Sequence, residues 1–248
     1  MGKSPHPALM ATLLRHYGTQ HWWPARTRFE VIVGAFLVQN TAWTNAKLAL
    51  RRLRAAKVLT PVAIRKIRLR ELEQLVRSSG YFRQKARSLK TFVRFLDVSY
   101  GGSLHRMFAR PAPELRRELL TLTGVGEETA DVILLYAGGH EAFVVDVYAR
   151  RVAERHGIMG GKYADFQRHF VAALAGMEEV VANLSDHAPR HEASPMSRRG
   201  SSAKTKLYAE AHAVLVRVGN DFCRRIPECE ECPLRPYLPR RRGLSARG

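Results

Sequence analysis

Residues 122–149 read LTGVGEETADVILLYAGGHEAFVVDVYA, and the rest of the chain is organised around this stretch. The segment 122–126 predicts a tight hairpin, in which Gly124 and Gly126 are able to take positive φ and leave backbone N–H groups uncovered. From Glu127 onward, apolar residues recur at three- and four-residue spacing, which predicts a helix. Uncovered amides at a helix N-terminus form a site for an anion such as a phosphate group.

A single carboxylate, Asp146, follows two valines and precedes a second predicted helix, 147–155. Composition and spacing leave two interpretations open. In the first, the stretch is a glycine-rich connection between helices and Asp146 is an N-cap. In the second, the hairpin binds an anion and the carboxylate acts on a ligand.

LTGVGEETA followed by VVDVYARRV resembles the helix–hairpin–helix and catalytic-aspartate signature of the endonuclease III superfamily of DNA glycosylases. A looser similarity extends from about residue 8 to 238. The resemblance implies an all-α, two-domain fold with the DNA cleft between the domains. Its parts would be a six-helix domain over 32–144, a terminal helical domain built from 1–31 and 145–238, and a basic tail over 239–248.

The remaining sequence is consistent with an all-α chain, because no strand alternation or internal repeat is present. Periodic apolar residues predict helices over 7–17, 29–39, 43–55, 81–96, 163–175 and 207–218. One or two short helices are expected over 61–76 and a short one over 178–183, and residues 114–121 lead into the hairpin. Residues 101–113 are expected to be irregular. The polar, Ser/Pro/Arg-rich stretch 185–205 predicts a mobile loop or insertion.

Charge is the unusual feature of the composition. The chain carries 41 Lys and Arg against 22 Asp and Glu, a formal net charge of +19. Such a field favours polyanionic partners without distinguishing DNA from RNA or anionic lipid. No signal peptide or apolar run of transmembrane length is present, and all three cysteines lie within 223–232, which disfavours a disulfide framework. We therefore expect an intracellular protein of the cytoplasm or nucleoid, not bound to membranes.

Two acidic residues, Asp146 and Glu128, define the expected type of reaction. Cleavage of an N-glycosidic bond develops cationic character on the sugar, and a carboxylate at Asp146 could stabilise that charge and orient or deprotonate the attacking water. Glu128 is a departure from the family pattern. Bifunctional members place a lysine there, whose amine attacks the sugar and leads to strand cleavage. A carboxylate cannot form an imine, so the resemblance implies a monofunctional enzyme.

An aromatic set flanks the motif VQNTAW. All three tryptophans, Trp22, Trp23 and Trp43, fall within 22 residues. A flipped base is held by stacking, and an alkylated purine with positive charge is attracted to electron-rich rings. WWP and QNT with a following aromatic resemble the base pocket of the 3-methyladenine DNA glycosylase III branch. The alternative is that two of these rings belong to the core.

Further DNA contacts follow from the resemblance alone. It implies that the backbone of Gly124, Val125 and Gly126 meets DNA. Gln39, with Asn40 beside it, matches the side chain that fills the gap left by the flipped nucleotide. Tyr81 matches the wedge against the opposite strand. Four basic residues of the following helix predict a solvated, basic face that could meet phosphate: Arg83, Lys85, Arg87 and Lys90.

Cys223, Cys229 and Cys232 resemble the cluster loop of endonuclease III, with departures. The first gap is one residue short, and Leu238 stands where the fourth cysteine belongs. A [4Fe–4S] cluster normally takes four thiolates, so it would need another ligand, such as Asp221, a glutamate or a small molecule. Zinc held by three thiolates and one other group, or a loop without metal, are the alternatives.

These features together predict a monomeric, monofunctional DNA glycosylase of base excision repair. Its substrate would be double-stranded DNA containing a damaged base, with an alkylated purine of the 3-methyladenine type as the base removed. The alternatives are an endonuclease III-like glycosylase for an oxidised pyrimidine or mismatched adenine, and a DNA-binding paralogue without catalysis.

Overall fold

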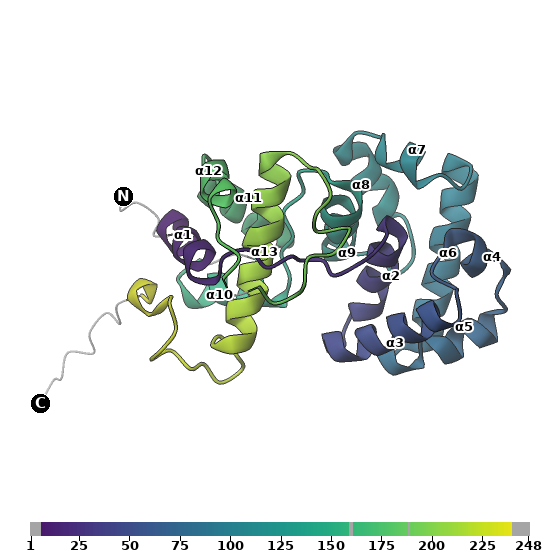
Figure 1. The fold of residues 1–248 in the computed structure, drawn as a ribbon, viewed down its shortest axis with the longest axis horizontal. Helices are drawn as coiled ribbons and strands as arrows, with labels where there is room; N and C mark the ends of the chain where they lie inside the picture. The colour runs from purple at the N-terminus through teal and green to yellow at the C-terminus, as the bar shows by residue number, and fades with distance from the viewer. Residues whose placement is uncertain (1–5, 159–160, 188, 240–248) are drawn as a thin grey trace, which may run out of the picture. The chain divides into compact units, whose positions relative to one another are not determined.

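The computed structural model describes residues 6–158, 161–187 and 189–239. Over these residues the chain is helical and contains no β-strand, which confirms the predicted all-α class (Figure 1). No helix in the described ranges combines the length and the apolar character that crossing a membrane requires. The chain divides into two compact units, each assembled from segments that are distant in sequence.

Unit 2 comprises residues 23–142 and 192–205. Its helical elements are α2 (Arg28–Val38), α3 (Trp43–Ala55), α4 (Pro61–Lys66), α5 (Leu69–Leu75), η1 (Arg77–Ser79), α6 (Phe82–Tyr100), α7 (Leu104–Phe108), α8 (Ala112–Leu120), α9 (Glu127–Val132) and the π-helical η2 (Ile133–Gly138). Helix α2 begins where the Thr27 hydroxyl accepts from the amide of Glu30, and it is buried almost all round. Packing of Phe36 against Phe92 joins it to α6. Helix α2 is therefore the central element of this unit.

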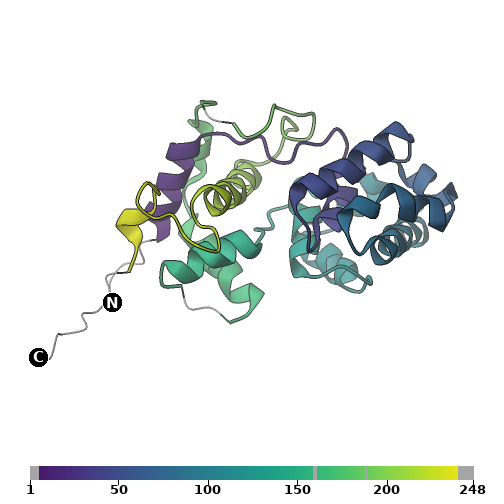
Figure 2. The same cartoon turned by 90° about the horizontal axis from the view of Figure 1, so that it is seen from below.

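Unit 1 comprises residues 1–22, 143–191 and 206–248, as far as they are described. Its helices are α1 (His6–Tyr17), α10 (Val147–Arg155), α11 (Tyr163–Ala173), α12 (Glu178–Ala182), most of α13 (Ala203–Asp221) and η3 (Arg235–Tyr237). Phe143 stacks on Phe170 of α11 at 5.1 Å and meets the edge of Tyr208 of α13 at 5.6 Å. Figure 2 shows α13 running between α1 and the pair α10 and α11. The segment that leads to Asp146 is thus set in the core of this unit.

Several boundaries differ from those predicted. Helix α6 continues to Tyr100, and the short α7 lies in the stretch expected to be irregular. Helix α13 begins at Ala203, before the predicted start. Described residues of 185–202 form no helix, as expected of a loop, but 192–205 belong to unit 2, where Ser194 Oγ donates to Trp23 O at 3.0 Å. The predicted domain boundaries stay a prediction.

Candidate functional site

The hairpin lies between α8 and α9 in unit 2. Gly124 has φ +86°, and a Cβ there would fall 2.5 Å from Ser88 Oγ, so only glycine fits. Gly126 differs from the prediction, because its backbone is extended at φ −95° and nothing lies within 4 Å of a Cβ built on it. The Val125 side chain is buried. The hairpin therefore packs against the protein at Gly124 and Val125, while the space beside Gly126 is open.

Gln39 joins the end of α2 to this hairpin. Its Nε2 donates to Gly124 O at 2.9 Å and to Thr129 Oγ1 at 2.8 Å. The side chain is consequently held by the protein in this state. The structure brings Gln39 next to the hairpin, which is what a shared role in DNA contact requires. That Gln39 fills the gap left by a flipped nucleotide stays a prediction.

Asn40 and Tyr81 both have left-handed backbone conformations, with φ 51° and 44°. Such angles are uncommon for residues other than glycine and tend to occur at functional sites. Asn40 is exposed, and Tyr81 is 69% exposed at the start of α6. A large aromatic side chain so far out of the core fits the predicted wedge, although that role is untested.

Lys85 links the end of α2, which precedes Asn40, to η1, which precedes Tyr81. Its Nζ donates to Leu37 O at 2.9 Å and to Ser79 O at 2.5 Å, and burial lowers its pKa to about 8. The expectation that Lys85 belongs to a solvated basic face is therefore wrong. Its position on α6 faces the core, where two carbonyl groups replace water.

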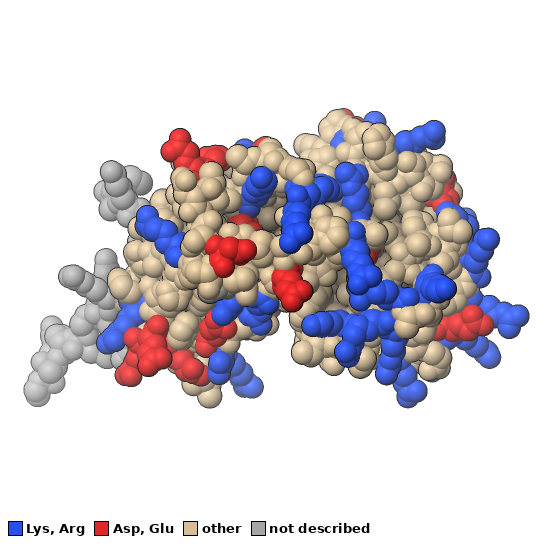
Figure 3. All heavy atoms as spheres, in the orientation of Figure 1, with Lys and Arg blue, Asp and Glu red and all other residues tan. Residues whose placement is uncertain are grey.

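Basic side chains nevertheless gather on unit 2. Figure 3 shows many Lys and Arg side chains and few acidic ones over the part of this unit where Figure 1 labels α3. Helix α3 exposes Lys47, Arg51 and Arg52, and α6 exposes Arg83 and Arg87. Unit 2 thus offers a positively charged surface suited to a polyanion.

The three tryptophans belong to two different units. In unit 2, Trp23 is 4% exposed and meets Trp43 edge-on, with centroids 5.4 Å apart. Trp23 also lies against Tyr136 at 5.5 Å, a neighbour that sequence reasoning missed. In unit 1, Trp22 is half-buried and lies 5.0 Å from the ring of His191. The burial of Trp23 gives it a packing role, and the predicted base pocket remains untested.

Asp146 is the N-cap of α10 in unit 1. Its Oδ1 accepts from the amides of Tyr148 at 3.0 Å and Ala149 at 2.8 Å. The residue before it is also fixed, since Val145 N donates to the hydroxyl of Tyr163 at 3.2 Å. The other carboxylate oxygen, Oδ2, lies 3.5 Å from Nε2 of His212, and the Asp146 side chain is 12% exposed. One oxygen therefore caps the helix, while the other faces His212.

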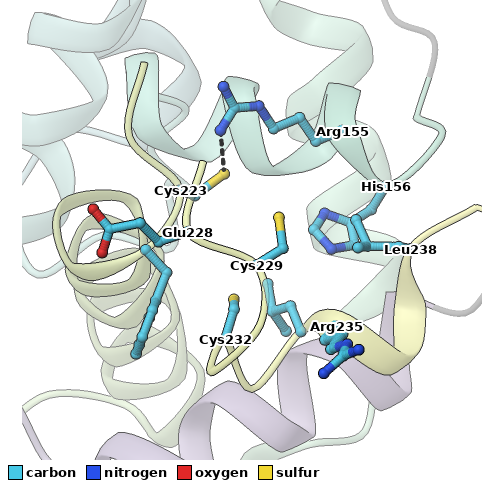
Figure 4. A pocket seen from close by; sticks show the side chains of 10 residues that line it. Arg155, His156, Cys223, Glu228, Cys229, Cys232, Arg235 and Leu238 are labelled. Carbon is cyan, nitrogen blue, oxygen red and sulfur yellow. Dashed lines mark hydrogen bonds between the residues drawn. The ribbon is translucent and has the colours of Figure 1, made fainter. Parts of the chain in front are cut away.

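The cysteines line one cavity in unit 1, which holds about 310 Å³ of space that is partly open to solvent. Figure 4 shows the side chains of Cys223, Cys229 and Cys232 around it. Arg155 donates to Cys223 Sγ at 3.2 Å, and burial raises the pKa of the Cys232 thiol. His156 also lines the cavity, with its Nδ1 donating to a carbonyl of α10 at 2.8 Å. Sequence spacing gave no sign of this histidine.

These groups do not fit a four-thiolate cluster. The chain has only three cysteines, and Leu238 lines the cavity in place of a fourth. Within the ranges that the structure describes, no three His, Cys, Asp or Glu side chains are arranged to hold a metal ion. A Cys–His set would suit zinc rather than [4Fe–4S], but only after the side chains rearranged.

Comparison with known proteins defines the class. The model of the HhH-GPD superfamily of base excision DNA repair proteins matches residues 33–174, and the chain belongs to this family of DNA glycosylases. The Methanocaldococcus jannaschii protein named "Putative DNA repair glycosylase MJ1434" is 35% identical, with 91% of each chain covered. Endonuclease III of Thermotoga maritima is 27% identical, covering 87% of this chain and 85% of that one.

A solved structure agrees with the predicted branch. The 3-methyladenine DNA glycosylase of H. pylori, MagIII, bound to 1,N6-ethenoadenine, superposes with a TM-score of 0.71. Its sequence is 25% identical, and the match covers 87% of this chain and 97% of that one. The resemblance to helix–hairpin–helix glycosylases and the two-domain fold class are confirmed.

Proposed function

We propose that this protein is a monofunctional DNA glycosylase that hydrolyses the N-glycosidic bond of an alkylated purine flipped out of duplex DNA. The observation that supports it most directly is the divided use of the Asp146 carboxylate. Oδ1 is held by two backbone amides, which leaves Oδ2 as the oxygen that can meet a developing sugar cation. In this proposal Asp146 stabilises that cation and orients the water that replaces the base.

The choice of base rests on the aromatic residues and on one relative. In unit 2, Trp43 is a half-buried ring that packs edge-on against the buried Trp23. In unit 1, Trp22 is also a half-buried ring. Aromatic faces bind a positively charged alkylated purine through stacking and cation–π attraction. MagIII, the similar H. pylori enzyme, is named for 3-methyladenine and was solved with ethenoadenine. We therefore propose alkylated adenines as the substrate class.

A substrate panel tests this proposal. Methylated DNA and duplexes with 3-methyladenine, 1,N6-ethenoadenine, an oxidised pyrimidine or adenine opposite a mismatch are incubated with the protein. Released free bases are then identified by mass spectrometry. Release of alkylated adenine supports the proposal. Release of only an oxidised pyrimidine would favour the activity suggested by the endonuclease III relatives, and binding without release would indicate a catalytically inactive DNA-binding protein.

The hairpin is proposed to hold a DNA phosphate on its backbone amides, and Gly126→Val tests this. The variant should fold normally, because φ is extended and the Cβ position is open. The added side chain would nevertheless screen the amides from phosphate. We expect the affinity for damaged and undamaged duplex to fall together, by about tenfold, because phosphate contacts carry no sequence information. Fluorescence anisotropy measures both affinities.

Gly161→Val is a matched control for this variant. Gly161 is also a glycine with open space around its Cβ position, but it belongs to unit 1, whereas the hairpin belongs to unit 2. The affinity of Gly161→Val for duplex DNA should remain that of the wild type. A loss confined to damaged DNA in Gly126→Val would place the hairpin in base recognition and contradict the phosphate role.

We propose that the cysteine cavity takes no stable [4Fe–4S] cluster. Three thiols ligate only three of the four irons, and Leu238, in the place of the fourth cysteine, offers no donor atom for the remaining one. Protein purified without oxygen should therefore lack a cluster or lose its brown colour in air while its circular dichroism is unchanged. Iron, sulfide and zinc analysis checks this. A stoichiometric cluster that survives in air would show that another ligand replaces the fourth cysteine.

A further inference from the structure

Helices α10 and α13 approach each other very closely. A Cβ added to Gly219 of α13 would fall 2.5 Å from Cδ1 of Tyr148 in the first turn of α10. Only glycine therefore lets α13 lie against this turn without displacing the ring. The two helices therefore meet at the N-terminal turn of α10, where Asp146 is the cap.

His212 lies on the same face of α13 as Gly219, because the two are seven residues apart, about two helical turns. The residue is 3% exposed, and its Nε2 lies 3.5 Å from Asp146 Oδ2. The neighbouring α13 residues Ala211, Val214 and Leu215 are buried apolar side chains, so the imidazole has little room to turn elsewhere. This histidine therefore faces the carboxylate from a rigid position.

We propose that His212 is a positioning residue for Asp146, an inference that rests on the proposed glycosylase function. The two amides of α10 fix Oδ1, but a carboxylate held through one oxygen can still rotate about its bond to Cβ. His212 restricts that rotation from the Oδ2 side. It thereby keeps the second oxygen where the sugar cation develops.

This role differs from that of a catalytic acid or base. His212 is almost fully buried, whereas Asp146 retains 12% side-chain exposure, so the carboxylate and not the imidazole faces solvent and substrate. Orientation of a charged group contributes to the chemical step and not to ground-state DNA binding. Loss of His212 should therefore lower the rate of base release and leave the affinity for DNA unchanged.

The experiment compares single-turnover base release by His212→Leu and His212→Gln, with dissociation constants measured in parallel. Leucine removes the polar contact, while glutamine keeps an N–H donor at similar reach. We expect the rate to fall at least about tenfold for leucine and to recover largely for glutamine, with affinities unchanged. His212→Met, with an adaptable apolar side chain, replaces the leucine variant if that one does not fold. His169→Leu, on α11 of the same unit, should behave as the wild type.

A double-mutant cycle that combines His212→Leu with Asp146→Asn tests whether the two residues act together. The slow residual rates are followed over long incubations. If His212 acts through the carboxylate, the double variant should be no slower than Asp146→Asn. Equal rate losses in both backgrounds, or a wild-type rate in His212→Leu when Asp146→Asn is impaired, would overturn the inference. An active Asp146→Asn would instead overturn the proposed function itself.

Discussion

Asp146→Asn should slow single-turnover base release by at least about a hundredfold, the effect of losing a placed electrostatic stabiliser. Asparagine keeps the side-chain size and an oxygen that can still accept from the amides of Tyr148 and Ala149. The cap, and with it the melting temperature, should change little, and so should DNA affinity. What disappears is the negative charge that meets the sugar cation.

Asp165→Asn is the matched control for this prediction. Asp165 also accepts a backbone amide at the start of a helix of unit 1, that of Lys162 at 3.0 Å. Its replacement removes one negative charge from a comparable position. Base release should remain near that of the wild type. Near-normal turnover by Asp146→Asn would reduce Asp146 to a helix cap.

Much of the fold could be predicted from apolar spacing and local turn chemistry. The buried residues of helix α3 recur at helical spacing, and this spacing predicts the observed bounds of the helix. Two glycines that flank a valine before a helix predict the hairpin, and Gly124 takes the predicted positive φ. These features depend on neighbours in sequence. Gly126 could not be judged in this way, because its extended backbone is compatible with any residue.

The interpretation of Lys85 shows where charge is a poor guide. The run of basic residues predicts a solvated face for Lys85, yet this side chain lies in the buried stripe formed with Leu89, Phe92 and Leu96. Helical spacing alone would have placed it inside. The carbonyl partners that make burial tolerable, Leu37 O among them, come from elements distant in sequence.

The site partners that were missed share one property. His212 is 66 residues from Asp146, and His156 is 67 residues from the first cysteine of its cavity. Neither histidine belongs to a local motif. Their positions follow from how α10 and α13 pack and from where the chain returns after α13. Such contacts are set by tertiary packing, and the spacing of residues in the sequence predicts only local neighbours.

The second large effect concerns the type of reaction. The resemblance to bifunctional glycosylases places Glu128 at the position of their lysine, so the protein should have no amine there to attack the sugar. Borohydride should trap no covalent protein–DNA adduct, and product strands should remain intact until alkali cleaves the abasic site. Denaturing gels with and without alkali measure strand cleavage, and a gel of borohydride-treated reactions measures trapping.

Glu128→Lys and Glu127→Lys make this test specific to the position. Both residues are exposed in the first turn of α9, so both variants should fold, and each changes the net charge by the same amount. Only a lysine at 128 occupies the place of the lyase amine, since successive helical residues point about 100° apart. We expect a trapped adduct with Glu128→Lys and none with Glu127→Lys. Efficient trapping by the wild-type protein would mean that another amine of the chain reaches the sugar, and the monofunctional assignment would be wrong.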